Sequence, residues 1–279
     1  MTTAATTLDQ PVAQKKRRNR HTIRAAFNKH VLTVLAIGVF LFLYVPIVVL
    51  IIYSFNENRF VSNWTGFSTQ WYSVLFQDSQ MGSAFRLSLW VGLWSTVIST
   101  ILGTLAALAM ERYSFRGKLA FDGVLYLPII IPDIAMALST LLFFVTMGIA
   151  LSRNTILIAH VAFNIAFVAI IVRARLADMD DALEDAAADL GANEWVTFRR
   201  ITLPLMMPGI VAAALLAFTL SIDDFVISFF VAGPGSTTLP VRVYSMIRFG
   251  LSPEVNAVST LMFVGSRILV VISLLIQRR

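Results

Sequence analysis

The chain of 279 residues contains no cysteine and only three histidines. The absence of cysteine excludes disulfide bonds and cysteine-ligated metal centres. His21, His30 and His160 are scattered without the spacing of a metal site, so no zinc motif forms around them. Charged residues are also scarce: they make up 14% of the chain, whereas a typical soluble domain has about 25%. Because 57% of the residues are hydrophobic, the composition predicts a membrane protein.

The sequence also lacks the short motifs of several enzyme classes. No Gly-x-x-x-x-Gly-Lys-Ser/Thr motif occurs, because Arg112 stands where the first glycine before Gly117-Lys118 would be. Gly-x-Ser-x-Gly and His-Glu-x-x-His are absent as well. We therefore expect that this chain is not an enzyme, and that any ATP-driven step belongs to a separate subunit.

Six apolar stretches are each long enough to cross a bilayer, since a hydrocarbon core of about 30 Å requires about 20 helical residues. They are residues 31–53, 86–110, 121–147, 154–173, 206–231 and 256–276. A polar and basic tail, residues 1–30, precedes the first of them. The sequence therefore predicts an all-α membrane protein with six transmembrane helices, and residues 31–279 form its membrane domain.

Lysine and arginine residues are distributed unevenly between the two predicted sides of the membrane. One side carries sixteen: seven before residue 31, three in residues 111–119, four in residues 173–204 and two at the C-terminus. The other side, which includes the long loops 54–85 and 232–255, carries five. Because cytoplasmic loops are enriched in these residues, both termini are expected in the cytoplasm. The basic tail would then meet anionic lipid, which accounts for the net charge of +6 without nucleic acid.

Residues 174–204, called the coupling loop below, form the longest polar interval between two apolar stretches. Acidic residues lie at the start of a predicted short helix within it, where the helix dipole favours them. Three consecutive alanines favour the helical state, and Gly191 is predicted to end the helix. Pro204 is expected in the first turn of the next helix, where proline is tolerated. The small alanine side chains leave a shallow surface that another protein could approach closely.

The spacing of this loop resembles that of the cytoplasmic coupling loop of ABC importer permeases. The residues in register with it are Glu184, Asp185, Ala186, Ala187, Gly191, Ile201, Leu203 and Pro204. The resemblance implies a type I ABC importer permease fold, in which the short helix docks into a groove on an ATP-hydrolysing subunit. A pair of such ATP-binding subunits would hold ATP and magnesium, and this chain would hold no cofactor. One departure is Asp185, because the family usually has glutamate there.

Three acids lie within predicted spans, namely Asp133 in the third and Asp223 and Asp224 in the fifth. A charge at the centre of a membrane helix costs about 2.5–3.5 kcal/mol on insertion scales, so such residues normally face a partner or a water-filled path. Arg267 is the only basic residue clearly within a span, and one ion pair would leave two acids uncompensated. We interpret the acids as part of a cation pathway. Internal pairing combined with a protonated aspartate stays open as the alternative.

Several longer segments are similar to the permeases of spermidine/putrescine importers, and most of all to their second permease subunit. They include Ser54-Phe55-Asn56, Trp71-Tyr72-Ser73, Phe115-Arg116-Gly117-Lys118, Ser221-Ile222-Asp223-Asp224-Phe225, Gly233-Pro234-Gly235 and Ser252-Pro253-Glu254-Val255-Asn256-Ala257. In that family the membrane acids and an outer-loop tryptophan handle the polycationic substrate. The resemblance therefore implies this role for Asp133, Asp223, Asp224 and Trp71, with Ser221 nearby.

The same resemblance implies the partners and the location of the protein. It favours a sister permease over a second copy of this chain, and it implies a periplasmic polyamine-binding protein. A multi-pass protein of the bacterial inner membrane is expected.

Other interpretations of the sequence stay open. An ABC permease for another small cationic solute would share the features described so far. An ion-coupled secondary transporter of organic cations could use Asp133 or Asp223 as a proton or sodium site. It would work without an ATPase, and it leaves the spacing of the coupling loop unexplained. An intramembrane aspartyl enzyme is disfavoured, because Asp133 lacks the flanking glycine that such a site would suggest.

Overall fold

The computed structural model describes residues 11–59, 63–180, 182–250 and 252–277. Two compact units make up the chain, residues 1–53 and residues 54–279. The first unit contains helix α1 (Pro11–Tyr53). Its apolar part, Val31–Tyr53, is long enough to cross a membrane, as the sequence predicted. Of the predicted basic ends of the chain, residues 1–10, Arg278 and Arg279 lie outside the described residues.

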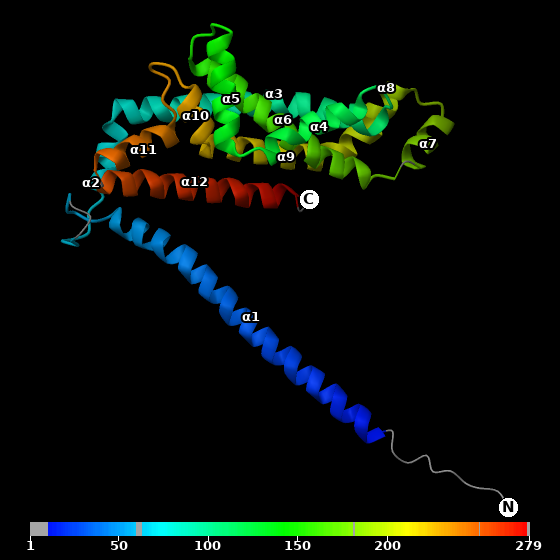
Figure 1. The fold of residues 1–279 in the computed structure, drawn as a ribbon, viewed down its shortest axis with the longest axis horizontal. Helices are drawn as coiled ribbons and strands as arrows, with labels where there is room; N and C mark the ends of the chain where they lie inside the picture. The colour runs from blue at the N-terminus through cyan, green and yellow to red at the C-terminus, as the bar shows by residue number, and fades with distance from the viewer. Residues whose placement is uncertain (1–10, 60–62, 181, 251, 278–279) are drawn as a thin grey trace, which may run out of the picture. The chain divides into compact units, whose positions relative to one another are not determined.

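Three long helices form the centre of the second unit and lie side by side (Figure 1). They are α3 (Ser79–Arg112), α6 (Arg153–Ala177) and α9 (Leu203–Asp223). Gly103 lets α3 approach α6 closely, because a Cβ atom there would lie 2.6 Å from the Val168 side chain. A Cβ atom at Gly92 would lie 3.1 Å from Ile222 of α9. Glycine at these contacts permits the close packing that drives helix association in membranes.

The remaining described elements of the second unit lie around the three central helices. In chain order they are α2 (Gln70–Gln77), α4 (Lys118–Ile130), α5 (Asp133–Thr146), α7 (Ala182–Asp189), α8 (Glu194–Thr197), the π-helical turn η1 (Phe198–Thr202), α10 (Val226–Val231), α11 (Leu239–Phe249) and α12 (Pro253–Gln277). Helix α10 contacts both α5 and α6, and their buried side chains form one apolar cluster with α3. Within the described residues, the strand-like pairing is limited to one isolated bridge between Asn56 and Phe67.

Four helical segments in the described part of the chain are long and apolar enough to cross a membrane, or five if α4 and α5 together count as one. They include the segments predicted from residues 31–53, 86–110 and 154–173. The sixth predicted span, residues 256–276, lies on α12. Six spans and a cytoplasmic location of both termini therefore stay predictions.

Two of the predicted continuous spans are broken. The third changes direction by 114° between α4 and α5, at Ile131 and Pro132. Proline lacks the backbone N–H that would continue the hydrogen-bond ladder of the helix, so Pro132 favours a break there. The prediction of one helix over residues 206–231 is wrong, because α9 ends at Asp223 and α10 begins at Val226. The carboxylate of Asp224 accepts hydrogen bonds from the first turn of α10 and so starts a new helix.

The two long loops 54–85 and 232–255 contain helices that the sequence analysis did not identify. Helix α2 lies in the first and α11 in the second. An ion pair of 3.3 Å between Asp78 and Arg242 joins the two loops. Partial burial raises the pKa of Asp78, but hydrogen bonds from the backbone of Gln80 and Met81 and from Arg242 outweigh it and leave that pKa below its usual value. This lowered pKa keeps the carboxylate ionised and available to Arg242.

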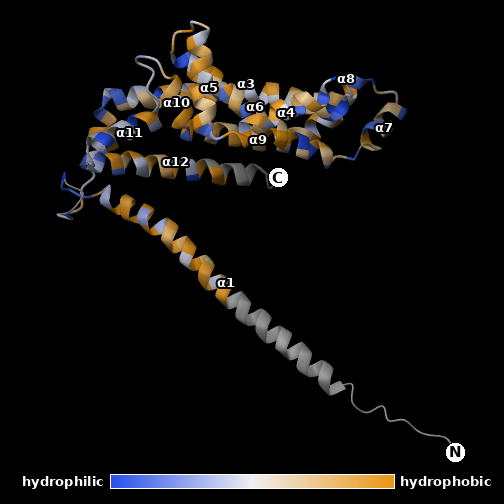
Figure 2. Ribbon diagram, in the orientation of Figure 1, coloured by the Kyte–Doolittle hydropathy of each residue, from blue (hydrophilic) through white to orange (hydrophobic). Residues whose placement is uncertain are grey.

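The polar residues of the second unit gather toward its ends. In Figure 2, hydrophilic residues concentrate around α7 and α8 and around α2 and α11, whereas hydrophobic residues dominate α5 and α9. Large apolar side chains of α3, α4 and α5 are exposed, among them Leu105, Ile130 and Leu142 at 58–74%. Apolar surface between two polar ends is the pattern of a protein that spans a membrane.

Replacing Gly103 by alanine should weaken the contact between α3 and α6, because the added methyl group would overlap Val168. We expect a loss of about 1–3 kcal/mol of stability, as for other overpacked cores. The midpoint of thermal unfolding of the purified chain in detergent measures this loss of stability. Gly123→Ala on α4 is the matched control, since no atom lies within 4 Å of a Cβ atom there. An unchanged unfolding midpoint in Gly103→Ala would contradict the close approach.

Candidate functional site

The coupling loop folds into a short helix followed by a tight turn. Helix α7 ends at Asp189, and Gly191 has a φ angle of 82°, a left-handed conformation that favours glycine. The N–H of Gly191 donates to the carbonyl of Ala188 at 2.8 Å, and the N–H of Ala192 donates to the carbonyl of Ala187 at 3.0 Å. These bonds satisfy carbonyls at the helix end, as Gly191 was predicted to allow.

Glu184 ties α7 to two other elements of the unit. Its carboxylate accepts two hydrogen bonds from the guanidinium of Arg112 at the end of α3, at 2.7 and 2.5 Å. The hydroxyl of Thr202, the last residue of η1, donates to the same carboxylate at 2.7 Å. Motion of α7 is therefore linked to α3 and to the start of α9. Arg112 is 72 residues from Glu184, so the spacing of the motif gave no signal for it, and Thr202 lies within the coupling loop but is not one of the residues that carried the resemblance.

The face of α7 that does not contact the unit is open. Asp185 and Ala186 are exposed, whereas Ala187 is buried. Leu190 is 89% exposed and Trp195 67% exposed, although both are apolar. Exposed apolar side chains beside an acidic helix provide a surface for another protein. The remaining predicted residues of the coupling loop lie within helical turns. Ile201 is in η1, and Leu203 and Pro204 form the first turn of α9.

A second polar cluster lies where α9 gives way to α10. We call it the polar junction; it consists of Ser95, His160, Ser221, Asp224 and Ser228. The Nδ1 atom of His160 lies 2.6 Å from the Ser221 hydroxyl, which lies 2.8 Å from the Ser95 hydroxyl. The Nε2 atom of His160 lies 3.1 Å from the Asp224 carboxylate and 3.1 Å from the Ser228 hydroxyl. Side chains from α3, α6, α9 and α10 thus meet in one network.

One tautomer of a neutral His160 satisfies this network. An ionised Asp224 can only accept hydrogen bonds, so the Nε2–H group donates to it. The Nδ1 atom then accepts from the Ser221 hydroxyl, and the one proton of the Ser95 hydroxyl is shared between Ser221 and the carbonyl of Gly92, 3.2 Å away. His160 is 2% exposed, and a buried polar group without partners would be costly. Hydrogen bonds within the polar junction therefore replace the bonds to water that these groups lose on burial.

The remaining predicted acids are placed differently. Asp223 is the last residue of α9 and is exposed, and the hydroxyl of Ser266 on α12 is a hydrogen-bond partner of its carboxylate. Asp133 is the first residue of α5, directly after the bend, and is also exposed. The structure brings Ser221 and Asp224 together through His160. Asp133 lies at the other helix break.

Trp71 stabilises the outer segment that precedes α3. Its indole N–H donates to the carbonyl of Asn56 at 2.7 Å, and its ring packs against an apolar cluster that includes Leu75, Met81 and Leu239. The polar edge of the indole is thus occupied within the chain. The predicted contact of Trp71 with substrate stays a prediction.

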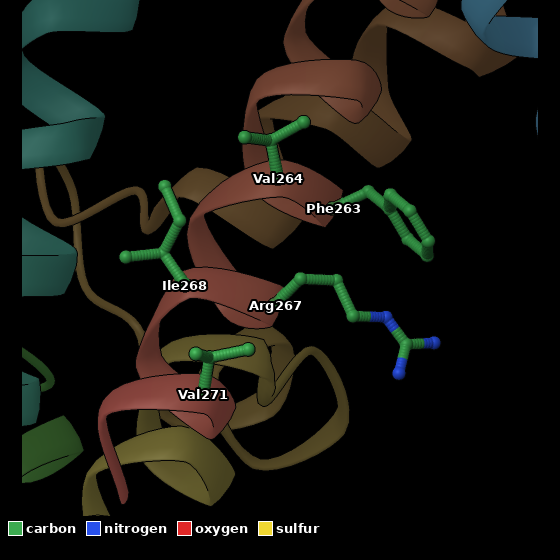
Figure 3. A pocket seen from close by; sticks show the side chains of 5 residues that line it. All are labelled: Phe263, Val264, Arg267, Ile268 and Val271. Carbon is green, nitrogen blue, oxygen red and sulfur yellow. The ribbon is translucent and has the colours of Figure 1, made fainter. Parts of the chain in front are cut away.

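A pocket on α12 has the wrong charge for a cation. Figure 3 shows Phe263, Val264, Ile268 and Val271 lining it, together with the long side chain of Arg267. The guanidinium carbon of Arg267 lies 4.9 Å from the centre of the Phe263 ring, a cation–π contact. Because its one charged lining group is a cation, this pocket does not suit a positively charged substrate.

His160 is the residue that the sequence analysis missed. It had been considered only as a metal ligand. A signal was present, because His160 lies within the predicted span 154–173, and ionisable residues within spans mark functional sites. The same rule had selected the three aspartates.

Comparisons with known proteins agree on the class of this chain. The chain is 44% identical over 241 residues to the spermidine/putrescine transport system permease protein PotC of Escherichia coli strain K12. The aligned region covers 86% of this chain and 91% of the relative. It is 45% identical over 237 residues to the putrescine transport system permease protein PotI of the same strain. That alignment covers 82% of this chain and 84% of the relative.

Solved structures with the same fold are chains of ABC transporters. A chain of a bacterial ABC transporter that imports the acidic polysaccharide alginate superposes with a TM-score of 0.71 over 94% of this chain and 97% of its own, at 19% identity. A chain of an amino acid ABC transporter gives a TM-score of 0.61 over 75% of this chain and 98% of its own, at 17% identity. At these identities the likeness concerns the fold. Residues 99–278 match the profile of one family, and the chain belongs to that family, the binding-protein-dependent transport system inner membrane components.

Proposed function

We propose that this chain is a membrane-spanning permease subunit of an ATP-driven importer that moves polyamines from the periplasm to the cytoplasm. The observation that carries the proposal is the identity of 44–45% to PotC and PotI over more than four fifths of the chain, since both relatives are named for polyamine transport. The proposal includes six spans, both termini in the cytoplasm and a location in the bacterial inner membrane.

Such an importer requires partner proteins. This chain has no P-loop motif, so a pair of ATP-binding subunits would supply ATP and magnesium. A periplasmic polyamine-binding protein would deliver the substrate; the related alginate transporter was crystallised with a periplasmic protein bound to an alginate pentasaccharide. The resemblance to second permease subunits favours a sister permease as the membrane partner.

The open face of α7 is the surface that would dock on an ATP-binding subunit. Asp185 and Ala186 are exposed there, and Leu190 and Trp195 add apolar area next to them. Glu184 connects this surface to α3 and α9 through Arg112 and Thr202. Closure of the two ATPases would pull α7, and the two central helices would carry the displacement into the membrane.

Acids at the two helix breaks suit the proposed substrate. A polyamine carries several ammonium groups, each of which requires an acceptor once it leaves water. Asp133 and Asp223 are exposed on the chain and could provide these acceptors in turn. Tyr244 and Phe225 lie in contact near the second break, with ring centres 4.7 Å apart, and aromatic faces also attract organic cations.

Reconstituted complex should hydrolyse ATP faster when its binding protein carries spermidine or putrescine. The complex needs this chain, its sister permease and its ATPase in proteoliposomes, with ATP hydrolysis measured beside uptake of radiolabelled polyamine. Amino acids, sugars and 2-aminoethylphosphonate are the controls; a permease named for the last of these is 28% identical to this chain. Stimulation by one of the controls alone would retain the importer and refute the polyamine substrate. Uptake by this chain without an ATPase would favour a secondary transporter.

Gly191→Val should uncouple ATP hydrolysis from the presence of substrate. A side chain at a φ angle of 82° costs roughly 1–2 kcal/mol, enough to move the end of α7 away from its docking position. We expect substrate-stimulated hydrolysis and uptake to fall by about tenfold or more, while assembled complex is still recovered. Gly148→Val is the control, because Gly148 has a φ angle of 67° but lies outside the coupling loop. Equal losses in both variants would argue against a specific role of the α7 end.

A further inference from the structure

We infer that the neighbouring acids Asp223 and Asp224 have different tasks, and that His160 is the positioning residue that separates them. In this inference Asp224 belongs to the polar junction and holds the break between α9 and α10, whereas Asp223 is presented to the cationic substrate. The inference rests on the proposed function and names which carboxylate serves it.

The carboxylate of Asp224 is occupied within the chain. One oxygen accepts from the backbone N–H of Ile227 at 3.2 Å. The other accepts from the N–H of Ser228 at 2.8 Å and lies 3.1 Å from the Nε2 atom of His160. The side chain is 15% exposed. An ammonium group could bind it only by displacing these donors, and the first turn of α10 would then lose its cap.

His160 anchors this junction to the rest of the bundle. Its second nitrogen contacts Ser221, which continues to Ser95 on α3. A further bond, from the Thr155 hydroxyl to the carbonyl of Val231, fixes the other end of α10 to the start of α6. Helix α10 is thus attached to α6 at both ends. Ser221 and Asp224 are both engaged in this attachment, although the sequence had assigned both to the substrate pathway.

Asp223 differs from its neighbour in each of these respects. It is exposed, and Ser266 on α12 is a single hydroxyl partner that an incoming ammonium group need not displace. Because Asp223 directly precedes the break, the position of Asp224 determines the direction of the Asp223 carboxylate. The fixed junction therefore makes Asp223 move together with α9 and α10 during transport, whereas contact with the substrate depends on the carboxylate of Asp223 itself.

The adjacent substitutions Asp223→Asn and Asp224→Asn form a matched pair for testing this division. In uptake assays with the assembled complex, Asp223→Asn should raise the KM for polyamine by about tenfold, as expected for the loss of one charge-assisted contact. Asp224→Asn and His160→Leu should instead lower the maximal rate by a similar factor and change the KM by less than about threefold. His160→Gln, which retains a donor near the position of Nε2, should recover part of the rate. A KM effect of equal size in both asparagine variants would overturn the inference.

Double variants test whether His160 acts through Asp224. His160→Leu combined with Asp224→Asn should be no worse than the more severe single variant, because both remove the same contact. His160→Leu combined with Asp223→Asn should show the product of the two single effects. Independent effects of His160→Leu and Asp224→Asn, together with no added effect of His160→Leu on Asp223→Asn, would show that His160 acts through Asp223 and would refute the assignment.

Cysteine labelling tests the geometry without relying on transport. The chain has no cysteine, so a single introduced thiol is the only one in this subunit. In the assembled complex, Asp223→Cys should react with a cationic methanethiosulfonate about tenfold faster than Asp224→Cys, since thiol reactivity follows exposure. Equal rates would refute the division. If the rates differ as expected but no polyamine is taken up or protects the thiol, the polyamine substrate fails and the assignment of Asp224 to the junction stands.

Discussion

Backbone groups freed at a helix break cannot be left without partners in a membrane, because no water is present to satisfy them. This constraint governs the two breaks in the chain. At the first, Pro132 removes a donor that would otherwise lack a partner, and α5 begins directly with Asp133. At the second, the carboxylate of Asp224 accepts the N–H groups of Ile227 and Ser228. Each break thus places an acid at the start of a helix, where the dipole favours negative charge. A requirement of folding in lipid brings acids to the positions where a cation pathway would use them.

Close packing of the central helices supports these breaks. Glycines at positions 92 and 103 allow α9 and α6 to approach α3 to within side-chain contact, and the buried Ser95 of α3 contacts Ser221 of α9. Near the C-terminal end of α6, arginine side chains join this helix to its neighbours. Arg173 of α6 pairs with Asp122 of α4, and the Nε–H of Arg175 donates to the carbonyl of Leu205 at 3.0 Å. Small residues set the distance between helices, and ion pairs fix their ends.

Local sequence patterns predicted the elements of this fold and few of their contacts. Apolar length located the segments around 31–53, 86–110 and 154–173, and the alanines before Gly191 located α7, because these signals lie within one element. The break at Asp224 was missed, since an apolar run of 26 residues gives no hint that a carboxylate will cap a new helix. His160 was missed as a junction residue for a related reason. Its partners Ser221 and Asp224 are 61 and 64 residues away, a pairing that only the packing of α6 against α9 creates.

The two sites of the unit are joined by the same pair of helices. On α3, Arg112 binds Glu184 at one end, and Ser95 reaches the polar junction about five turns away. On α9, the helix starts directly after Thr202, which also binds Glu184, and carries Ser221 near its other end. With 21 residues, α9 spans about 30 Å, close to the thickness of a membrane core. A displacement of α7 therefore acts on two adjacent, closely packed helices, of which α9 ends at Asp223 and α3 contacts the polar junction at Ser95. Because helices are stiff along their axes and the glycine contacts leave little space between them, the pull of an ATPase on α7 would reach Asp223 as a movement of the junction rather than as local unfolding.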